Sequence, residues 1–587
     1  MARLDRLGTA KEVAQLGAML GREFTYELLH AVSSLSEDTL QQSLWQLVET
    51  ELVFQSGVPP QATYLFKHAL VQDTASQSLL KSRRQQLHHQ IAQVLEKQFP
   101  QTVETQPEFV AHHYTEAGVS EQAITYWQQA GERASQRSAY VEAISHLTTG
   151  LELLKPLAET PGRVQQELTL QLALSNALLP VRGYAAPELE KAVTRARELC
   201  QQLGETPQLF PVLFRLWVFY FMRRELQTAR ELAEQLMRLA QSVQDPYLLS
   251  LAHAALGMTS HWLGELPSAR PHLEQAIALY DPQQHPRFTI GTADHRVDCL
   301  SHTAWTLWRL GYLDQALKRS QEALTLAAEL AHPYSLALTL GFTAVVHLLR
   351  GEGLLAQERA EAVMTLSAEQ GFPTWLAEGT MVRGGALAEQ GQVKEGLAQM
   401  QQGLAALRAM GTEPERLGFL SPLLAAAYAK VEQVEEGLTV LAEALAFVDK
   451  TGMRVGEAEL YRLRGELTLA REGKSQNSKG KNQKSENPNP KSQSPDPHTE
   501  AEACFLKAIE IAKKQQAKSL ELRAAMSLAR LWQQQATQWG ACATQHETRA
   551  KLDAAHTVLS EVYNWFTEGF DTKDLQEAKA LIEELRR

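Results

Sequence analysis

Histidine pairs are the first residues in this chain whose type and spacing suggest chemistry, because imidazole is a common metal ligand and general base. His88 and His89 are adjacent in the sequence, and so are His112 and His113. Adjacent residues of a helix point about 100° apart, so neither pair can readily hold one ion. The zinc-site patterns HExxH and H-x-E with C-x-x-C do not occur. We therefore expect ordinary helical histidines and no metal site.

Nucleophiles and phosphate-binding loops are equally poorly supported. The cysteines Cys200, Cys299, Cys504 and Cys542 form no pair at metal-binding or redox spacing, and no G-x-S-x-G elbow occurs. Residues 351–356 imitate a dinucleotide loop, but no strand precedes them. Neither a P-loop string nor an acidic Walker B strand is present. We expect no catalytic residue and no cofactor, with a triad assembled from distant positions as the alternative.

The composition is that of a globular protein with an acidic surface. The chain has 587 residues, of which 44% are apolar, and its 57 basic and 68 acidic residues give a net charge of −11. This apolar content excludes a disordered chain, and the negative charge disfavours binding to nucleic acid. Charged residues interrupt the N-terminus, and the most apolar stretch, Leu338–Leu349, is too short to cross a bilayer. We expect a soluble cytoplasmic protein.

The elements that must position any functional group are helices that recur at a nearly constant interval. A glycine followed five residues later by a second small residue occurs at Gly264/Ala269, Gly311/Ala316, Gly351/Ala356 and Gly391/Gly396. Two further units carry Arg224 and Glu432 in the position of the first glycine. We expect the glycine to end one helix in a left-handed turn and the small residue to let the next helix pack closely. The repeat predicts stacked helical hairpins.

These hairpins resemble tetratricopeptide repeats. The matching small residues are Gly257, Gly264, Ala269 and Ala276 in one unit, and Ala304, Gly311, Ala316 and Ala323 in the next. Trp217 occupies a position that is usually small, the closing proline is mostly missing, and the units exceed the usual length of about 34 residues. The resemblance covers about residues 105–587. It implies an all-α chain, a tetratricopeptide-like αα solenoid that forms a right-handed superhelix.

The resemblance also implies that the first helix of each hairpin lines a concave groove. The residues then expected to face the groove are Phe214, Val218, Phe221, Met258, His261, Trp305 and Trp308, with Arg223, Arg224 and Arg309 at or near the rim. Aromatic anchors are typical of peptide-binding surfaces, and arginines pair with acidic groups. The alternative is that degenerate repeats bury these rings between helices. Exchange of Trp305 and Trp308 for alanine separates the two, because only the buried alternative predicts a loss of helicity.

The first hundred residues follow a different pattern. Helical stretches at 9–20, 24–32 and 36–51 precede two short apolar runs around Gly57, which predict a β-hairpin. Three helices followed by a hairpin are typical of a winged helix, but the third stretch contains neither lysine nor arginine, so we do not expect it to read DNA. The expected domains are a winged-helix-like domain at 1–100, degenerate hairpins at 101–204, tetratricopeptide-like repeats at 205–470, an insert at 471–499, and C-terminal repeats with a cap at 500–587.

The insert at 471–499 is rich in Ser, Asn, Gln, Lys and Pro and has no aromatic residue. Such a segment cannot bury enough surface to fold, so we expect a disordered loop inside one hairpin. Its six basic and three acidic residues leave a basic docking strip as the alternative to a solvated tether.

Several phrases carry a second, longer resemblance. They are GREF (21–24), ATYLFKHALVQDTASQSLL (62–80), RRQQLHHQIAQVLE (83–96), AHHYTEAG (111–118), RGYAAPELE (182–190), ELYRLRGEL (459–467), QQAKSLELRAAMSLARLW (515–532) and VYNWFTEGFDTKDLQEAKALIEEL (562–585). Together they are similar to the C-terminal half of bacterial STAND signalling ATPases, which often carry class III adenylate or guanylate cyclase domains or protein kinase domains. His68 matches a recurring position of that family, where we expect a packing or hydrogen-bonding role rather than a signalling one.

Three functions follow from these patterns. The first is a non-enzymatic interaction and sensing module, which presents a helical groove to a protein or peptide partner and acts in trans on a separately encoded STAND ATPase or nucleotide cyclase. The resemblance begins near Arg3, close to where the ATPase would end, so the second is a fragment of a cyclase or ATPase whose nucleotide-binding parts are not in this chain. The third is a transcription regulator that uses the winged helix.

Overall fold

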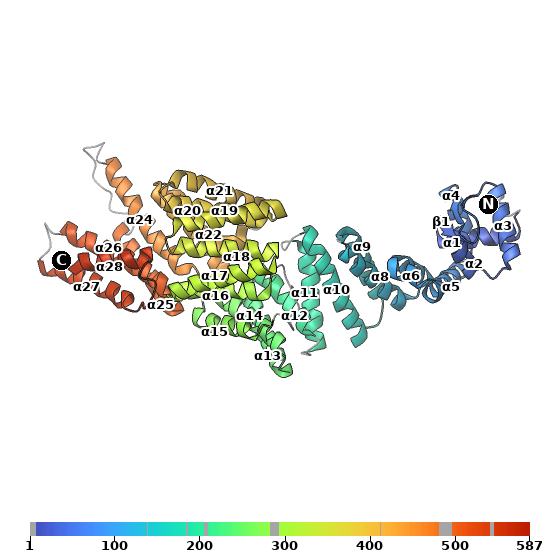
Figure 1. Cartoon of the computed structure of the whole chain (residues 1–587), viewed down its shortest axis with the longest axis horizontal. Coiled ribbons are helices and arrows are strands. Elements are labelled where there is room, and N and C mark those ends of the chain that lie inside the picture. Colours follow the sequence, from blue (N-terminus) through green and yellow to red (C-terminus); the bar gives the residue numbers. More distant parts are fainter. Residues whose placement is uncertain are drawn as a thin grey trace, which may run out of the picture. The chain divides into compact units, whose positions relative to one another are not determined.

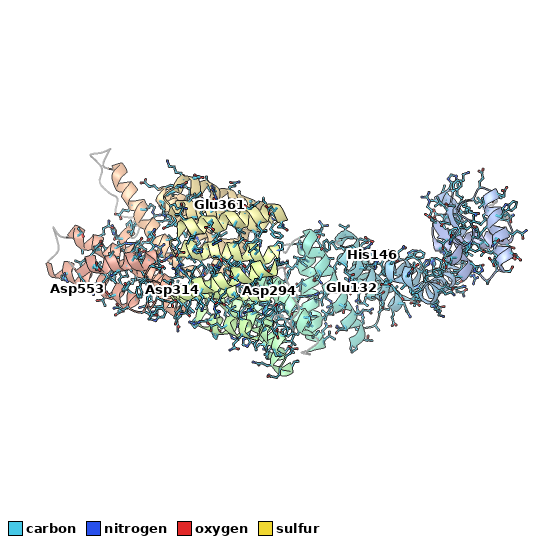
Figure 2. All side chains as sticks on the ribbon, viewed as in Figure 1. Glu132, His146, Asp294, Asp314, Glu361 and Asp553 are labelled. Atoms are coloured by element: carbon cyan, nitrogen blue, oxygen red, sulfur yellow. The ribbon has the colours of Figure 1, made fainter. Side chains whose placement is uncertain are left out.

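The computed structural model describes residues 7–137, 139–182, 186–204, 209–281, 293–410, 413–479, 496–539 and 545–586. These residues form 28 helices and one three-stranded sheet, which confirms the all-α prediction (Figure 1). The chain separates into two compact units, Met1–Gly204 and Glu205–Arg587. Each unit has its own clusters of buried hydrophobic residues, and Figure 2 draws the side chains of both.

The first unit begins with three helices and the small sheet. Its elements are α1 (Thr9–Leu20), β1 (Glu23–Thr25), α2 (Tyr26–Val32), α3 (Glu37–Glu49), β2 (Val53–Ser56) and β3 (Thr63–Phe66). The sheet is antiparallel in the order β1-β3-β2, with Phe24 opposite Tyr64. The ring of Phe24 lies directly over Gly17 of α1, where a Cβ would be only 2.7 Å from it. The helices and the hairpin therefore lie close to their predicted ranges, while the winged-helix assignment stays a prediction.

The remainder of the first unit is helical. Its helices are α4 (Ala69–Gln77), α5 (Lys81–Gln98), α6 (Pro100–Thr105), α7 (Pro107–Ala117), α8 (Ser120–Gln136), α9 (Tyr140–Leu154), α10 (Pro161–Arg182) and α11 (Pro187–Leu203). From α7 onward each helix packs on the next, and Ile124, Leu147 and Leu170 are fully buried between them. Helical hairpins therefore begin well before the regular repeats.

The second unit consists of eight hairpins and a final helix. The first helices are α12 (Phe210–Met222), α14 (Pro246–Trp262), α16 (His295–Leu310), α18 (Pro333–Leu349), α20 (Pro373–Glu389), α22 (Glu413–Lys430), α24 (Glu457–Lys479) and α26 (Lys518–Trp539). The second helices are α13 (Leu226–Val243), α15 (Leu266–Leu279), α17 (Leu313–Leu330), α19 (Gly353–Gln370), α21 (Val393–Ala409), α23 (Val434–Thr451), α25 (Pro497–Gln515) and α27 (Gln545–Tyr563), and α28 (Lys573–Arg586) ends the chain. This is the tetratricopeptide-like solenoid that the repeats predict.

The turns inside six of the hairpins, from α12–α13 to α22–α23, have the predicted left-handed backbone. The four glycines of the repeat have φ of 79° at Gly264, 97° at Gly311, 80° at Gly351 and 89° at Gly391. Arg224 and Glu432, which occupy the same position without being glycine, both have φ of 59°. A side chain in this conformation costs roughly 1–2 kcal/mol. The turn shape is therefore retained even where the residue that favours it is absent.

The predicted insert is shorter than its composition suggests. Helix α24 continues to Lys479 and α25 begins at Pro497, so both ends of the expected loop are helical. Once a helix is nucleated, each added residue contributes a hydrogen bond at little cost, which lets α24 run on into polar sequence. Residues 480–495 lie outside the described residues. Helices α24 and α25 pack on each other as a hairpin, with the insert between them. No helix in the described part of the chain is long and apolar enough to span a bilayer.

Candidate functional site

The first helices of the second unit form an inner layer that closes on itself. Helix α16 packs on α18, and the contacts continue through α20, α22 and α24 to α26, which packs back on α16. The hydroxyl of Ser519 in α26 donates to the carbonyl oxygen of Trp308 in α16 at 2.5 Å, across 211 positions of sequence. Small rotations between successive hairpins accumulate into a superhelix, which brings such distant repeats together. We call these six helices the inner ring.

The hairpin turns at Gly264, Gly311 and Gly351 lie against the C-terminal part of the unit, and we call them the covered turns. A Cβ on Gly311 would be 2.6 Å from the ring of Trp565, and one on Gly351 would be 2.7 Å from the side chain of Lys573. At Gly391, in contrast, a Cβ would have nothing within 4 Å. The closed inner ring therefore requires glycine at the covered turns, because a Cβ there would collide with the C-terminal part of the unit.

The carboxylate of Glu568 holds the start of α17. One of its oxygens accepts the backbone N–H groups of Asp314 and Gln315 at 3.0 and 3.1 Å, and the other accepts from the Gln315 side chain at 3.1 Å. Asp314 in turn accepts the backbone N–H of Gly569 at 3.1 Å. The first N–H groups of a helix lack partners within it and carry partial positive charge. A residue 254 positions away therefore supplies the cap that α17 lacks locally.

A cavity of about 380 Å³ lies inside the inner ring, with α28 contributing to its wall. This volume is near the small end of the range for ligand pockets, roughly 300–1,000 Å³. Large apolar side chains from five of the six inner-ring helices line it, namely Trp305, Trp308, Val345, Leu348, Leu349, Leu423, Leu463, Leu520 and Met526. The cavity suits a small ligand or the end of a peptide.

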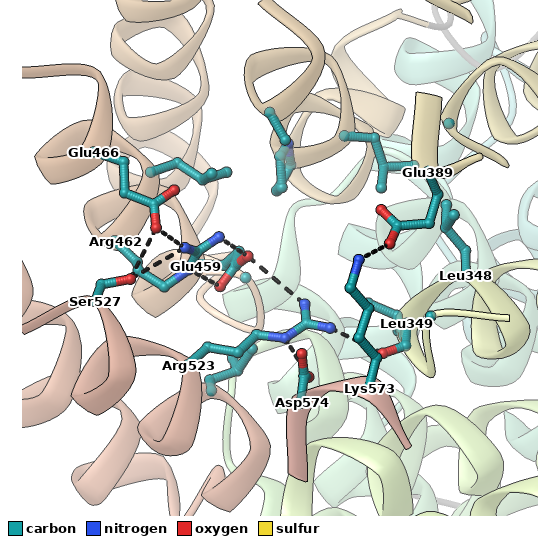
Figure 3. Close-up of a pocket in the computed structure, with 18 of the residues that line it drawn as sticks. Leu348, Leu349, Glu389, Glu459, Arg462, Glu466, Arg523, Ser527, Lys573 and Asp574 are labelled. Atoms are coloured by element: carbon teal, nitrogen blue, oxygen red, sulfur yellow. Dashed lines mark hydrogen bonds and ion pairs between the residues drawn. The ribbon is translucent and has the colours of Figure 1, made fainter. Parts of the chain in front are cut away.

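Buried ion pairs cross the cavity wall between α24, α26 and α28 (Figure 3). Arg462 contacts Glu459 at 2.8 Å and Glu466 at 2.5 Å, while Arg523 contacts Asp574 at 2.7 Å and reaches Glu459 at 3.7 Å. Burial alone raises the pKa of Glu459, but the charge and hydrogen bonds of Arg462 outweigh it and hold that pKa below its usual value. The network stays ionised at neutral pH and joins three helices.

Arg523 also joins these helices to the opposite side of the inner ring. Its Nη2 donates to the carbonyl oxygen of Leu349 at 2.9 Å, and its guanidinium lies 4.9 Å from the ring centre of Trp308. Lys573 and Lys430 both pair with Glu389 of α20. The charged residues of α26 and α28 thus fasten the C-terminal helices to α16, α18 and α20.

Three of the residues expected in a groove line this cavity. Trp305, Trp308 and Arg309 of α16 form one part of its wall. Both tryptophans are only 2% exposed, and Trp305 stacks on Phe342 with ring centres 4.1 Å apart. Its indole N–H donates to the Phe342 carbonyl at 3.0 Å. These rings are packed in the core and at the same time border the cavity.

The other expected groove residues do not line the cavity. Phe214 and Phe221 both pack against Trp217, the first tilted and the second stacked, with ring centres 5.1 and 4.9 Å away. Met258 and His261 are buried in α14, and His261 hydrogen-bonds Thr306 at 2.8 Å. Of the remaining three, Val218 and Arg223 are half-buried, and Arg224 is buried.

The arginines expected at a rim are partly displaced from it. Arg224 is 4% exposed because its guanidinium packs on the rings of Phe221 and Trp262, at 5.3 and 4.4 Å from their centres. Arg309 is 7% exposed and lies in the cavity wall. Cation–π packing in a crowded helix layer explains why these side chains turn inward. A partner contact at these residues stays a prediction.

The histidine pairs meet in a way that their spacing did not predict. His88 of α5 and His113 of α7 are joined by a hydrogen bond of 2.8 Å between their Nδ1 atoms. Burial, followed by the charge of His112, lowers the pKa of His88 to about 4. No group of three metal-ligating side chains occurs among the described residues. His68 is exposed at the N-cap of α4 and its side chain makes no capping bond, so the packing or hydrogen-bonding role expected for it stays a prediction.

The cysteines in the described residues are all free and buried. They are Cys200, Cys299 and Cys504, whereas Cys542 lies outside the described residues. Burial raises the pKa of each of the three thiols, that of Cys200 to about 12. A protonated, buried thiol is a poor nucleophile.

Sequence reasoning missed the C-terminal half of the cavity wall. Glu459, Arg462, Arg523, Lys573 and Asp574 carry no local pattern that predicts a site. All five nevertheless lie in the three C-terminal phrases that carry the STAND resemblance, at 459–467, 515–532 and 562–585. The signal that could have found them was therefore the grouping of charged residues inside those phrases.

Comparison with known proteins gives distant similarity. The chain matches no family model. An uncharacterized protein of Rhizobium meliloti (strain 1021) is 24% identical over 482 residues, which cover 81% of this chain and 46% of that protein. The chain thus spans about half the length of the curated relative it matches.

Two solved structures are among those that are similar to this chain. A Rap protein complexed with competence and sporulation factor is 12% identical, with a TM-score of 0.47, and covers 68% of this chain and 99% of its own. A STAND protein with a tetratricopeptide repeat sensor from Pyrococcus horikoshii is 13% identical, with a TM-score of 0.37, and covers 80% of this chain and 63% of its own. Both are helical-repeat proteins.

Proposed function

We propose that this chain is a non-enzymatic binding and sensing module whose second unit receives a peptide end or other small ligand. The observation that carries this proposal is the cavity inside the inner ring, which combines two tryptophans with buried charged groups. Apolar walls supply affinity, and a few convergent polar groups supply orientation. A ligand bound there would contact both halves of the closure, α16 on one side and α24, α26 and α28 on the other.

Such a ligand would change how firmly the ring is closed. Binding to the closed state stabilises it in proportion to ligand concentration over dissociation constant. The C-terminal helices α26 and α28 would then be held more tightly against the covered turns. A binding event in the cavity is in this way converted into a change in the mobility of helices at the surface of the unit.

The wider role we propose is that of the sensor arm of a STAND-type signalling protein. The phrases shared with that family support it, and the first unit would be a winged-helix domain followed by degenerate hairpins. The arm would act on a nucleotide-binding partner, an ATPase or a cyclase. The acidic α3, which carries Glu37, Asp38 and Glu49 in thirteen residues, disfavours the alternative of a DNA-reading regulator.

The experiment that tests the binding proposal is affinity selection from a library of short peptides. Peptides that remain with the full chain through size exclusion are identified by mass spectrometry. The variant Ala426→Phe places a ring in the cavity, because Ala426 lines it from α22. We expect the wild type to retain a set of related sequences and Ala426→Phe to retain none of them.

The matched control is Ala405→Phe, which adds the same ring at an exposed position of α21. It should retain the same peptides as the wild type, and circular dichroism should show unchanged helicity in both variants. Equal retention by Ala426→Phe and wild type, or no related sequences in the wild type, would contradict the proposal.

A further inference from the structure

The charged side chains of the cavity do not balance. Six cationic and five carboxylate side chains line it, and the cations are Arg309, Lys430, Arg462, Arg523, Arg530 and Lys573. Five of them have a carboxylate within 4.0 Å: Lys430 and Lys573 pair with Glu389, Arg462 with Glu459 and Glu466, Arg523 with Asp574, and Arg530 with Glu577. Arg309 is the exception among the cavity cations.

Arg309 is deeply buried, and among the described residues no carboxylate lies within 4.0 Å of its guanidinium. Its Nη1 donates to the carbonyl oxygen of Trp305, one turn earlier in its own helix, at 3.1 Å. Burial, followed by the nearby charge of Arg523, lowers the pKa of Arg309 to about 10. The guanidinium therefore remains cationic at neutral pH while facing repulsion from a second cation.

A buried charge without a partner is costly, by several kcal/mol in real proteins. The neighbouring carboxylates cannot relieve this cost, because Glu459 and Asp574 already bind Arg462 and Arg523. A neutral side chain of similar length would leave the ring closed and the cavity intact. The position is therefore one at which stability is reduced, which is typical of binding sites.

The surroundings of Arg309 define what would satisfy it. A guanidinium binds a carboxylate through two parallel hydrogen bonds, which a lysine cannot reproduce. Trp305 and Trp308 border the cavity beside it and offer apolar surface. The excess of one positive charge matches a monoanion, whereas a phosphate monoester would bring a second negative charge that has no partner.

We infer that the cavity binds a small monocarboxylate, with its carboxylate group on Arg309 and an apolar part against Trp305 and Trp308. This inference rests on the proposed function, because it assigns a ligand class to the same cavity. The carboxylate has two possible sources, the C-terminus of a peptide and a free organic acid. The cavity volume of about 380 Å³ accommodates either one, but only the last residues of a peptide.

Matched acid and amide probes test the inference on the full chain. The peptide pair is N-acetyl-Leu-Leu with a free carboxylate and the same dipeptide as its C-terminal amide. The free-acid pair is indole-3-propionate and indole-3-propionamide. Calorimetry and the thermal midpoint of the second unit are measured with each probe at neutral pH and low salt. We expect at least one acid to bind about ten- to hundredfold more tightly than its amide, as charge-assisted hydrogen bonds provide.

The variant Arg309→Met removes the charge and keeps the length of the side chain. It should bind acid and amide equally, and without ligand it should melt at the same temperature as the wild type or higher, because an unpaired buried charge is gone. The control is Arg530→Met, which removes a cation from the same cavity that has Glu577 as its partner. This variant should keep the preference for the acid.

Four results would overturn the inference. They are equal binding of acid and amide to the wild type in both pairs, no binding of any probe, a preference for the acid that survives Arg309→Met, and a lower melting temperature of ligand-free Arg309→Met, which would make Arg309 a structural residue. A preference confined to one pair identifies the source of the carboxylate and supports the inference. Library peptides that bind the cavity with acid and amide ends alike would leave the proposed function standing and refute only the carboxylate.

Discussion

The hairpin turns at Gly311 and Gly391 share a local design but differ in their surroundings. Both follow the first helix of a hairpin, both have φ near 90°, at 97° and 89°, and both precede a small residue five positions later. Gly311 lies against Trp565, Phe566 and Lys518, while a Cβ at Gly391 would meet nothing within 4 Å. The same turn thus serves in one hairpin only to reverse the chain and in the other also to seat a distant helix.

This difference shows that the repeated hairpins and the closure of the inner ring have separate structural requirements. Each hairpin needs a left-handed turn and a small residue, and these are local requirements. Closure of the inner ring needs residues of α26, such as Ser519 and Arg523, to meet helices that precede them by about two hundred positions. The cavity exists only because both sets of requirements are met.

The largest effect is expected from Arg523→Ala. The side chain pairs with Asp574, approaches Glu459 and covers Trp308, so its loss leaves buried carboxylates without their full charge. We expect a loss of about 3–5 kcal/mol in the unfolding free energy of the second unit. Urea unfolding measures it, and hydrogen exchange should rise in α26 and α28 first.

Arg530→Ala is the matched control for that change. Arg530 and its partner Glu577 are 49% and 40% exposed, so the pair contributes only about 0–1 kcal/mol. Equal losses for Arg523→Ala and Arg530→Ala would mean that the ion pairs of the cavity wall do not hold the ring closed.

Alanine substitutions at Gly311 and Gly391 test directly whether the two turns differ in their surroundings. Gly391→Ala places a Cβ in a left-handed turn with open space around it, and we expect a loss of roughly 1–2 kcal/mol from the backbone alone. Gly311→Ala adds a clash with Trp565 and Lys518, which raises the expected loss by roughly 1–3 kcal/mol. The measurement is the unfolding free energy of each variant. If the two losses are the same, Gly311 is not in contact with the C-terminal helices.

Glu568→Gln should have a smaller effect at the same interface. The carboxylate caps the N–H groups of Asp314 and Gln315, and the amide keeps one acceptor oxygen while losing the charge. We expect a loss of about 0.3–1 kcal/mol that shrinks in high salt, as a helix-dipole interaction does. Glu561→Gln, at an exposed position of α27, is the control and should change nothing. A loss that is independent of salt would contradict the electrostatic cap.

The smallest expected effect is a gain in stability at Glu432, an exposed residue in the turn between α22 and α23. Glu432 has the left-handed backbone of the repeat glycines, with φ of 59°, and its substitution by glycine relieves roughly 1–2 kcal/mol of strain. Glycine also stabilises the unfolded chain by about 0.4–1 kcal/mol, because it increases its conformational entropy. The expected gain in the unfolding free energy for Glu432→Gly is therefore below about 1 kcal/mol. A melting temperature below that of the wild type would show that the side chain of Glu432 contributes more than its turn costs.

The hairpin array could be predicted in detail because its rules are local. The unit with Arg224 in the glycine position was recognised because Ala229 lies forty residues before Ala269, and its turn has the predicted backbone. The insert was predicted to begin at 471, whereas α24 continues to Lys479, because composition does not reveal how far a packed helix continues. Boundaries of this kind depend on how well the helix is nucleated by its partner.

The cavity could be predicted only in part. Trp305, Trp308 and Arg309 were selected as residues of a first helix, and they do line the cavity wall. Phe214 and Phe221 were selected by the same rule and are packed around Trp217 instead. The rule gives the face of each helix but not how far the superhelix rotates, and that rotation decides which first helices surround a cavity.

The sequence by itself determined the helices, the turns and the stacking order, because a 3.6-residue apolar period and a small residue at each turn act within one hairpin. Only the tertiary structure decided that α26 returns to α16, that Glu568 caps α17, and that Arg309 is buried without a carboxylate. The physical reason is that these features depend on a small rotation per repeat, summed over several hairpins, and such a sum has no signature in any one of them.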